Sequence, residues 1–316
     1  MSVGRPGSGP LFEIARALRK VVIEVDLKSL INSGGVVVQQ GAADAIGVTP
    51  RKEFLAGPGA LLGGPANVIM QLSNPAVGRG VVESTVESGR FDRHPRKRGR
   101  TTLTYLAVAM WGTDDEREAY REATNRSHRQ VRSTPDSPVK YNAFDPRLQL
   151  WVAACIYRGT LDSLTYLYGP LDDSLADELY RESARFGTTL QMPPQLWPPD
   201  RAAFADYWES AMADISVDDE VKAYLLGQVV DLGPYSRGQQ LAFGRINRFF
   251  TTGFLPQRFR DELGLDWGPR RQRAFETIMR VIGMVLRTGP ERWRRYPLDK
   301  HLANMRRRRA EGRPLI

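Results

Sequence analysis

The sequence predicts an all-α fold, and three observations support that class. Apolar residues recur at spacings of three and four along most of the chain, as they do on the buried face of a helix. Proline or aspartate stands where these patterns begin and glycine where they end, and these are the residues preferred at helix starts and stops. The alternation of apolar and polar residues that marks a half-buried strand is nearly absent.

The composition is that of a globular protein. Of 316 residues, 41% are hydrophobic and 26% charged, which allows a sizeable core. We predict a single domain over residues 1–316, with loose tails at residues 1–10 and from about residue 300 to 316. The single cysteine, Cys155, excludes an intramolecular disulfide, and no run reaches the roughly 18–20 apolar residues of a membrane span. We therefore expect a cytoplasmic protein without a transmembrane segment.

The net charge of +9 is concentrated in two arginine-rich clusters, within residues 93–100 and 292–309. Basic clusters can bind nucleic acid or an anionic surface. These clusters contain few aromatic side chains and do not follow one helix face. We interpret them as solvated segments and expect no specific nucleic-acid binding.

Two helical patterns occupy the first part of the chain. The first covers residues 11–31. The second begins at Pro65, where a missing backbone N–H costs nothing, and continues to about Ser88. Pro75 interrupts this pattern and is expected to kink the helix at Asn74, because its ring clashes with the preceding turn.

A basic, threonine-rich segment precedes the most apolar helix of the first half. We expect residues 89–99 to form a charged loop, after which Thr101 or Thr102 caps a helix over residues 103–111. Gly112 ends that helix, since glycine terminates helices at low conformational cost.

The next helix, predicted over residues 115–132, is polar and carries His128. Asp114 places negative charge at its positive end. The other two histidines, His94 and His301, lie in basic segments. An imidazole presented from a rigid helix into an apolar pocket can ligate a haem iron, whereas a half-buried, hydrogen-bonded histidine is the commoner role. The residues alone leave both interpretations open.

Further helices are predicted in the second half of the chain. Asp145 and Pro146 begin one of them, Asp200 caps another, and Gly169 and Gly187 provide ends. The predicted ranges are 147–168, 172–186, 201–215, 218–226, 238–252 and 270–287.

Several common active-site motifs are absent. The chain has no HExxH motif and no CxxC pair, so a zinc site is not supported. The glycines within residues 57–64 do not follow a strand, which argues against a dinucleotide-binding fingerprint. The GxSxG elbow of serine hydrolases is also missing.

Two kinds of charged residue remain as candidates for chemistry. Glu83 and Glu87, four residues apart, would share a helix face. That face is either solvated or turned to a pocket, where one carboxylate could act as a base. Arg98 either faces solvent or pairs with a carboxylate such as a haem propionate.

Several short motifs follow one another in order from residue 64 to the C-terminus. They are GPA at 64–66, MQLSNPAV at 70–77, RGRTTLTYL at 98–106, WGT at 111–113, HRQV at 128–131, YNAFDP at 141–146, WV at 151–152, FADYW at 204–208 and LGLDW at 263–267. Their order and spacing resemble the family typified by the fungal oxygenase MpaB and by the catalytic domain of rubber oxygenase, the latex clearing protein.

The resemblance implies a mostly helical fold with a globin-like core and a b-type haem. The family members whose reaction is understood cleave carbon–carbon double bonds of isoprenoid chains with dioxygen. The resemblance therefore implies a hydrophobic, unsaturated, isoprenoid- or lipid-like substrate for this chain. By motif, His128 would be the proximal ligand of the haem iron. Arg98 and Thr102 would be the family's arginine and threonine near the haem, and Glu83 matches the acidic residue that serves as base in rubber oxygenase.

The chain departs from the family pattern at three positions. The family commonly has histidine where this chain has Asn74, and often again soon after the Trp-Val pair, where it has Ala153. Rubber oxygenase has lysine at the position of Thr101, so a distal lysine ligand is not supported. Two hypotheses follow: a haem-dependent oxygenase, or a non-catalytic helical protein of the same fold that binds haem or lipid.

Overall fold

The computed structural model describes residues 57–86 and 90–316, which belong to one compact unit that runs Lys52–Ile316. Helices make up the regular structure of these residues, and their one β-bridge, between Arg132 and Asn142, is isolated. The prediction of an all-α class is confirmed. The helix predicted over residues 11–31 and the tail at residues 1–10 lie outside the described residues.

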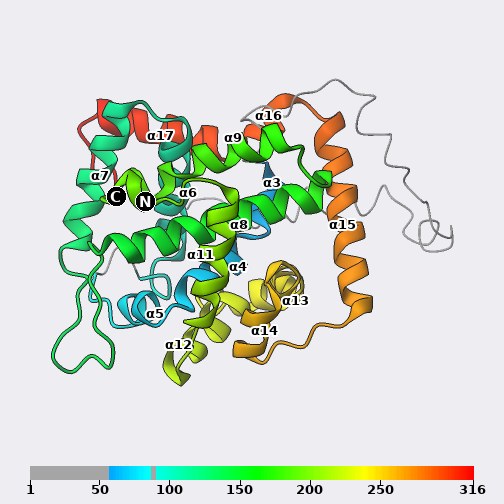
Figure 1. Cartoon of the computed structure of the whole chain (residues 1–316), viewed down its shortest axis with the longest axis horizontal. Helices are drawn as coiled ribbons and strands as arrows, with labels where there is room; N and C mark the ends of the chain where they lie inside the picture. Colours follow the sequence, from blue (N-terminus) through cyan, green and yellow to red (C-terminus); the bar gives the residue numbers. More distant parts are fainter. Residues whose placement is uncertain (1–56, 87–89) are drawn as a thin grey trace. The chain divides into compact units, whose positions relative to one another are not determined.

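The helices follow one another as labelled in Figure 1. The first are α3 (Pro58–Leu61), α4 (Gly64–Leu72), α5 (Pro75–Val82), α6 (Pro95–Trp111), α7 (Asp114–His128), α8 (Pro146–Tyr168), α9 (Asp173–Ser183) and α10 (Arg185–Thr188). A 3₁₀ turn η3 (Pro194–Leu196), α11 (Arg201–Ala213), α12 (Asp219–Tyr224) and a π-helical turn η4 (Leu225–Val230) follow. The last are α13 (Arg237–Phe254), α14 (Gln257–Leu263), α15 (Pro269–Thr288), α16 (Glu291–Arg295) and α17 (Leu298–Ala310). None of the described helices combines the length and the apolar composition needed to cross a bilayer.

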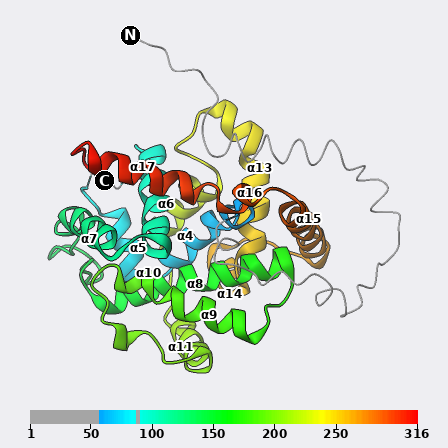
Figure 2. The ribbon, with the colours of Figure 1, turned by 90° about the horizontal axis from the view of Figure 1, so that it is seen from above.

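Helix α8 is central to this unit, and α9 runs alongside it (Figure 2). Asp145 accepts a hydrogen bond from the N–H of Arg147 at 2.8 Å, so the helix starts as predicted. Along its length α8 contacts α3, α4, α9, α10, α13 and α15. Gly159 permits the close approach of α4, because a Cβ there would clash with Asn67 Nδ2. That amide instead donates to the carbonyl of Cys155 at 2.6 Å.

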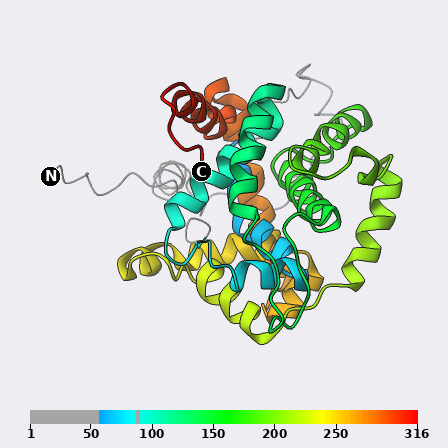
Figure 3. The same cartoon turned by 90° about the vertical axis from the view of Figure 1, so that its left-hand side faces the viewer.

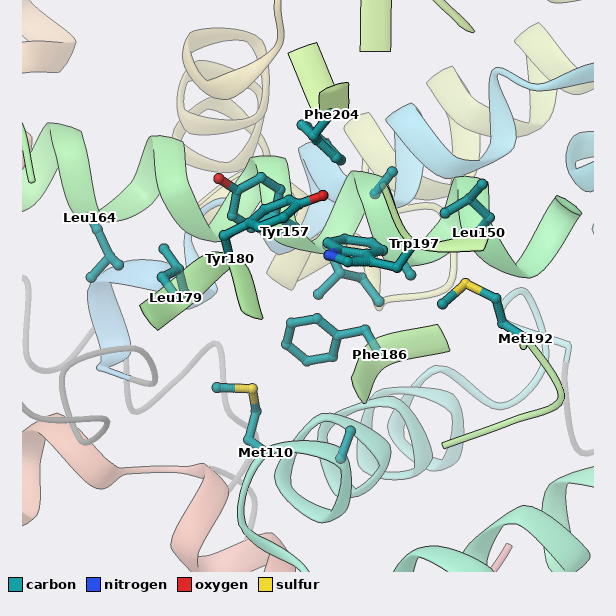
Figure 4. Close-up of a cluster of buried hydrophobic side chains, with 14 residues drawn as sticks. Met110, Leu150, Tyr157, Leu164, Leu179, Tyr180, Phe186, Met192, Trp197 and Phe204 are labelled. Carbon is teal, nitrogen blue, oxygen red and sulfur yellow. The ribbon is translucent and has the colours of Figure 1, made fainter. Parts of the chain in front are cut away.

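A cluster of buried aromatic side chains joins α8 to α9, η3 and α11 (Figure 4). The ring centroid of Tyr157 lies 5.3 Å from Tyr180, 6.0 Å from Trp197 and 4.8 Å from Phe204, and each pair is edge-to-face. This geometry places the positive edge of one ring against the negative face of another. The cluster fixes the positions of the helices that pack on this side of α8.

Three helix boundaries before α7 differ from the predictions. The expected kink at Asn74 is a break, because the Asn74 side chain accepts hydrogen bonds from the first N–H groups of α5 at 3.1 and 3.3 Å. Helix α5 then ends at Val82, before Ser88. The predicted loop over residues 89–99 was wrong from Pro95 onward, since α6 begins there rather than at residue 103. Pro95 serves as the first helical residue, and the arginines and lysine that follow are good helix formers. Neither Thr101 nor Thr102 is therefore a cap.

Helix α7 is shorter than predicted. It ends at His128 instead of residue 132, and Arg132 then forms the isolated bridge with Asn142. Pairing with the nearby residues 141–143 of the same loop has overridden the local helical pattern. His128 consequently lies in the last turn of the helix.

The C-terminal segment, predicted to be loose from about residue 300, is instead part of the packed unit. Leu298, Leu302 and Met305 of α17 recur at helical spacing and are buried in a cluster with residues of α6 and α7. The ribbon of α17 lies beside α6 (Figure 3). Arg306 donates to both carboxylate oxygens of Glu116 in α7, at 2.6 and 3.1 Å. In the sequence, the many arginines of this segment conceal the apolar stripe that Leu298, Leu302 and Met305 form on one face of α17.

Candidate functional site

Arg98 and Thr102 share one face of α6, since they are four residues apart in the same helix. Both are exposed, and neither side chain makes a hydrogen bond or ion pair with another described residue. The neighbouring hydroxyls of Thr101 and Thr104 differ, because they donate to carbonyl oxygens of the preceding turn at 3.0 and 2.7 Å. Thr102 therefore keeps a hydroxyl available for a ligand, beside an arginine that is also available.

Arg98 lies in a recess of the protein. Burial lowers the pKa of its guanidinium, an effect partly offset by the nearby phenols of Tyr224 and Tyr120. Water nevertheless reaches the side chain. A group that is both desolvated by its neighbours and accessible to solvent is surrounded on most sides and open on one. An arginine stays charged in proteins, so the recess contains a fixed positive charge without a counter-ion among the described residues.

His128 presents a neutral imidazole at the end of α7. The ring is half-buried, and its Nδ1 atom is fully buried without a hydrogen-bond partner. Burial, and then the positive charge of Arg98, lower the pKa of His128 to about 4. The imidazole is therefore unprotonated at neutral pH, which is the form that binds a metal. The ring of Phe144 lies edge-on to it, with centroids 6.4 Å apart.

A polar network fixes the turn of α7 that carries His128. Asn125, one turn before His128, accepts a hydrogen bond from the side-chain amide of Gln191. Gln149 of α8 donates to the Gln191 side chain at 2.7 Å and accepts from the Gln191 backbone N–H at 2.9 Å. Gln149 also donates to the carbonyl of Ala143 at 3.0 Å, in the loop that leads to α8. No local pattern signals this network, because its members come from three distant segments.

Glu83, predicted as a base, follows the last residue of α5. Its Oε2 atom accepts hydrogen bonds from Ser137 Oγ at 2.5 Å and from the Tyr141 hydroxyl at 2.9 Å. Its other oxygen lies 3.8 Å from Arg79 Nη1. Ser137 and Tyr141 belong to the loop that follows His128, so Glu83 ties α5 to that loop. A role as base stays a prediction. Glu87, its possible partner, lies outside the described residues.

Tyr224 is a candidate that the sequence analysis missed. It ends α12, just where the chain widens into the π-helical turn η4, a feature that often accompanies functional sites. Its half-buried phenol faces the charge of Arg98 and makes no hydrogen bond to a described residue. No pattern in the sequence marks a π-helical turn, so proximity to Arg98 was visible only in three dimensions.

Tyr224 also borders a cavity of about 260 Å³ between α5, α12, η4 and the segment before α6. Its lining residues are Val81, Val82, Arg90, Asp92, Glu220, Tyr224 and Gln228. Val81 and Val82 thus line a cavity, as expected for the end of this apolar segment. The earlier residues Ile69 and Met70 are instead buried in the core.

The three positions that depart from the family pattern have structural roles here. Asn74 caps α5. Ala153 is completely buried in the cluster around the α8 aromatic rings. Thr101 is buried, and its carbonyl accepts a hydrogen bond from the Tyr120 hydroxyl at 2.8 Å.

His128 and Arg98 are the described residues best suited to hold a cofactor. A haem needs a neutral imidazole from a rigid element, and its propionates bind cations. The unpartnered His128 ring and the unpaired Arg98 charge fit these two needs. Among residues 57–86 and 90–316, no group of three or more His, Cys, Asp or Glu is placed to hold a metal ion.

Comparison with known proteins places these residues in a family. Residues 51–284 match the family model described as "ER-bound oxygenase mpaB/B'/Rubber oxygenase, catalytic domain". The chain belongs to this oxygenase family. Two mycobacterial relatives, each called an uncharacterized protein, come from Mycobacterium bovis and Mycobacterium tuberculosis. Each is 47% identical over 251 residues, which cover 79% of this chain and 98% of the relative. No solved structure matches the chain.

The family match includes all four predicted site residues, Glu83, Arg98, Thr102 and His128. It ends within α15, so α16 and α17 lie beyond it. The packing of α17 against α6 and α7 is thus a feature of this chain outside the matched range.

Proposed function

We propose that this protein is a haem b-dependent oxygenase that uses dioxygen to oxidise a hydrophobic, unsaturated, isoprenoid- or lipid-like substrate. The observation that carries the proposal is the state of His128, a half-buried and neutral imidazole without a hydrogen-bond partner on Nδ1. Family membership supports the reaction class. The haem and the substrate class rest on the resemblance described above, and a cytoplasmic location stays a prediction.

Each predicted site residue has a task in this proposal. His128 would hold the haem iron, and burial keeps its imidazole unprotonated at neutral pH. When bound, the haem would supply the binding and activation of dioxygen. Arg98 would bind a propionate or a polarised oxygen, and the Thr102 hydroxyl would donate a hydrogen bond toward the reacting oxygen. Glu83 would be the base, and its Oε1 atom would take the proton, because Oε2 already accepts hydrogen bonds from Ser137 and Tyr141.

A second candidate is a non-catalytic haem- or lipid-binding protein of the same fold. The structural roles of Asn74 and Ala153, at positions where the family commonly has histidine, favour this alternative. Consumption of dioxygen with a reductant and a short unsaturated isoprenoid would separate the two. The oxygenase hypothesis expects turnover, and haem binding without turnover would support the carrier.

The haem assignment is tested by an ultraviolet–visible spectrum of the protein loaded with haem. We expect a Soret band that the His128→Ala variant loses or shifts strongly. His301→Ala is the matched control, because His301 is also half-buried on a helix and burial also lowers its pKa. Full haem content and an unchanged spectrum in His128→Ala would show that His128 is not the ligand.

A further inference from the structure

A second, smaller cavity lies next to the candidate site, on the apolar continuation of α6. We propose that it is a dioxygen-binding cavity, from which the gas reaches the site. The identity of the gas rests on the proposed oxygenase function. The existence of an apolar, gas-binding cavity does not, and it is tested separately below.

The cavity measures about 50 Å³, and its walls are almost wholly apolar. Leu106, Met110, Trp111, Ile156, Thr160, Phe186 and Leu298 line it, from α6, α8, α10 and the start of α17. The Thr160 hydroxyl is already occupied, because it donates to the carbonyl of Ile156 at 2.8 Å. Roughly 10–15 Å³ is enough for one water molecule, but a water also needs two to four polar partners. Apolar cavities bind xenon and other small apolar molecules.

The cavity follows the candidate site along α6. Arg98, Thr102 and Leu106 are spaced by four residues, so they form one ridge that turns slowly around the helix. Leu106 lies about 6 Å beyond Thr102 along the axis, at 1.5 Å of rise per residue. The polar face that would receive dioxygen thus leads directly to the apolar wall of the cavity.

The walls are held in place by contacts outside the cavity. Tyr105 of α6 donates a hydrogen bond to the carbonyl of Phe186, which fixes α10 against α6. The side chains of Phe186 and Met110 are neighbours at the lower edge of the aromatic cluster (Figure 4). Methionine is flexible and polarisable, so Met110 can yield to a small guest without displacement of the backbone.

The size of the cavity selects its occupant. A volume of about 50 Å³ suits a diatomic gas, whereas an isoprenoid chain needs a larger space. Dioxygen is apolar and gains by transfer from water to such a wall. The cavity would therefore raise the local concentration of dioxygen beside Thr102 without admitting the organic substrate.

Xenon is the probe for the cavity itself, bound to the full chain and followed by xenon NMR titration or in pressurised crystals. Thr160→Ile adds a methyl group that reduces the space. Thr165→Ile is the matched control on α8, because Thr165 is exposed and its hydroxyl makes the same kind of bond, at 2.9 Å. We expect xenon to bind the wild type and Thr165→Ile, to bind Thr160→Ile weakly, and to bind the enlarged Met110→Ala cavity more strongly. Absence of xenon from the wild type, or equal binding by Thr160→Ile, would overturn the proposal.

The role in dioxygen supply is measured on haem-loaded protein. We expect the second-order rate constant for dioxygen binding to the ferrous protein to fall severalfold in Thr160→Ile and to stay unchanged in Thr165→Ile. If xenon binding is lost in Thr160→Ile but the dioxygen rate is not, the cavity does not supply the site. If the protein binds no haem, the oxygenase proposal fails while the xenon result still decides whether the gas cavity exists.

Discussion

The two ends of helix α7 use polar residues in opposite ways. At the N-terminus, Thr113 accepts a hydrogen bond from the N–H of Glu116, and the Glu116 side chain accepts one from the Thr113 N–H, at 3.3 and 2.9 Å. Arg306 of α17 then binds the same carboxylate. At the C-terminus, His128 has no partner for its buried Nδ1 atom, and the charge nearest to it, Arg98, opposes its protonation.

This difference separates polar groups that stabilise the fold from polar groups that await a ligand. A buried polar atom without a hydrogen bond costs free energy, so a folded chain keeps few of them. The ion pair at Glu116 satisfies its donors and acceptors within the chain. At the other end, the Nδ1 atom of His128 is buried without a partner, and the exposed Arg98 and Thr102 make no bond to a described residue. Such an arrangement is expected where an external group completes the site.

The largest expected effect is a loss of activity, and it concerns the residues near the C-terminal end of α7. Arg98→Ala and Thr102→Val should lower turnover roughly ten- to hundredfold, because a charge-assisted hydrogen bond contributes about 1.5–3 kcal/mol to the transition state. Melting temperature should change little, since neither side chain makes a bond to a described residue. Thr104→Val is the control on the same helix, at a buried threonine whose hydroxyl donates to the carbonyl of Arg100. Variants that melt earlier but keep the wild-type haem spectrum and specific activity would remove both residues from the site.

The next largest effect is a loss of stability, and it concerns Glu116 at the N-terminal end of α7. Glu116→Ala removes the side-chain half of the capping box and the pair with Arg306, and should lower the free energy of unfolding by about 1.5–3 kcal/mol. Glu116→Gln should cost less, because glutamine still accepts the bond from the Thr113 N–H. Chemical denaturation gives both values. Haem affinity should be unaffected, and a large change in it would show that the two ends of α7 are not independent.

The smallest effect is the pH dependence of stability in the haem-free protein. The pKa of folded His128, about 4, lies below its ordinary value of 6.5, so between these pH values the unfolded chain binds a proton that the folded chain does not. The free energy of unfolding should therefore fall as pH falls from about 6.5 to about 4, by roughly 1–3 kcal/mol. His128→Phe should lack this component.

Glu116 titrates in a different window, which allows the two ends to be distinguished. Its hydrogen bonds with Arg306 lower its pKa below the ordinary 4.5, so its contribution is lost only at more acidic pH. Denaturation of the wild type, His128→Phe and Glu116→Gln between about pH 3 and pH 7 separates the contributions of His128 and Glu116 to the free energy of unfolding. This interval includes the ordinary pKa values of both side chains. An identical slope between pH 4.5 and 6.5 in the wild type and His128→Phe would contradict the buried, neutral state of His128.

Most of the helical architecture followed from local physics. Proline and aspartate at helix starts, and apolar spacing of three and four, are properties of single segments, so α8, α11 and α15 were placed within a few residues. Local rules failed where another segment decided the outcome. Residues 298–310 have a charge pattern that resembles a solvated tail, but Leu298, Leu302 and Met305 are buried in a cluster with residues of α6 and α7.

The sequence by itself determined the all-α class, the order of the helices and the identity of the site candidates, because periodicity, capping residues and motif order are local and readable. It could not determine which candidates meet. Only the tertiary structure brought Arg98, His128 and the unsuspected Tyr224 within electrostatic reach of one another, and set Glu83 apart as an anchor of the loop after His128. The physical reason is that the burial and the charge pairing of a side chain depend on residues from other helices, and these residues become neighbours only after the helices have packed.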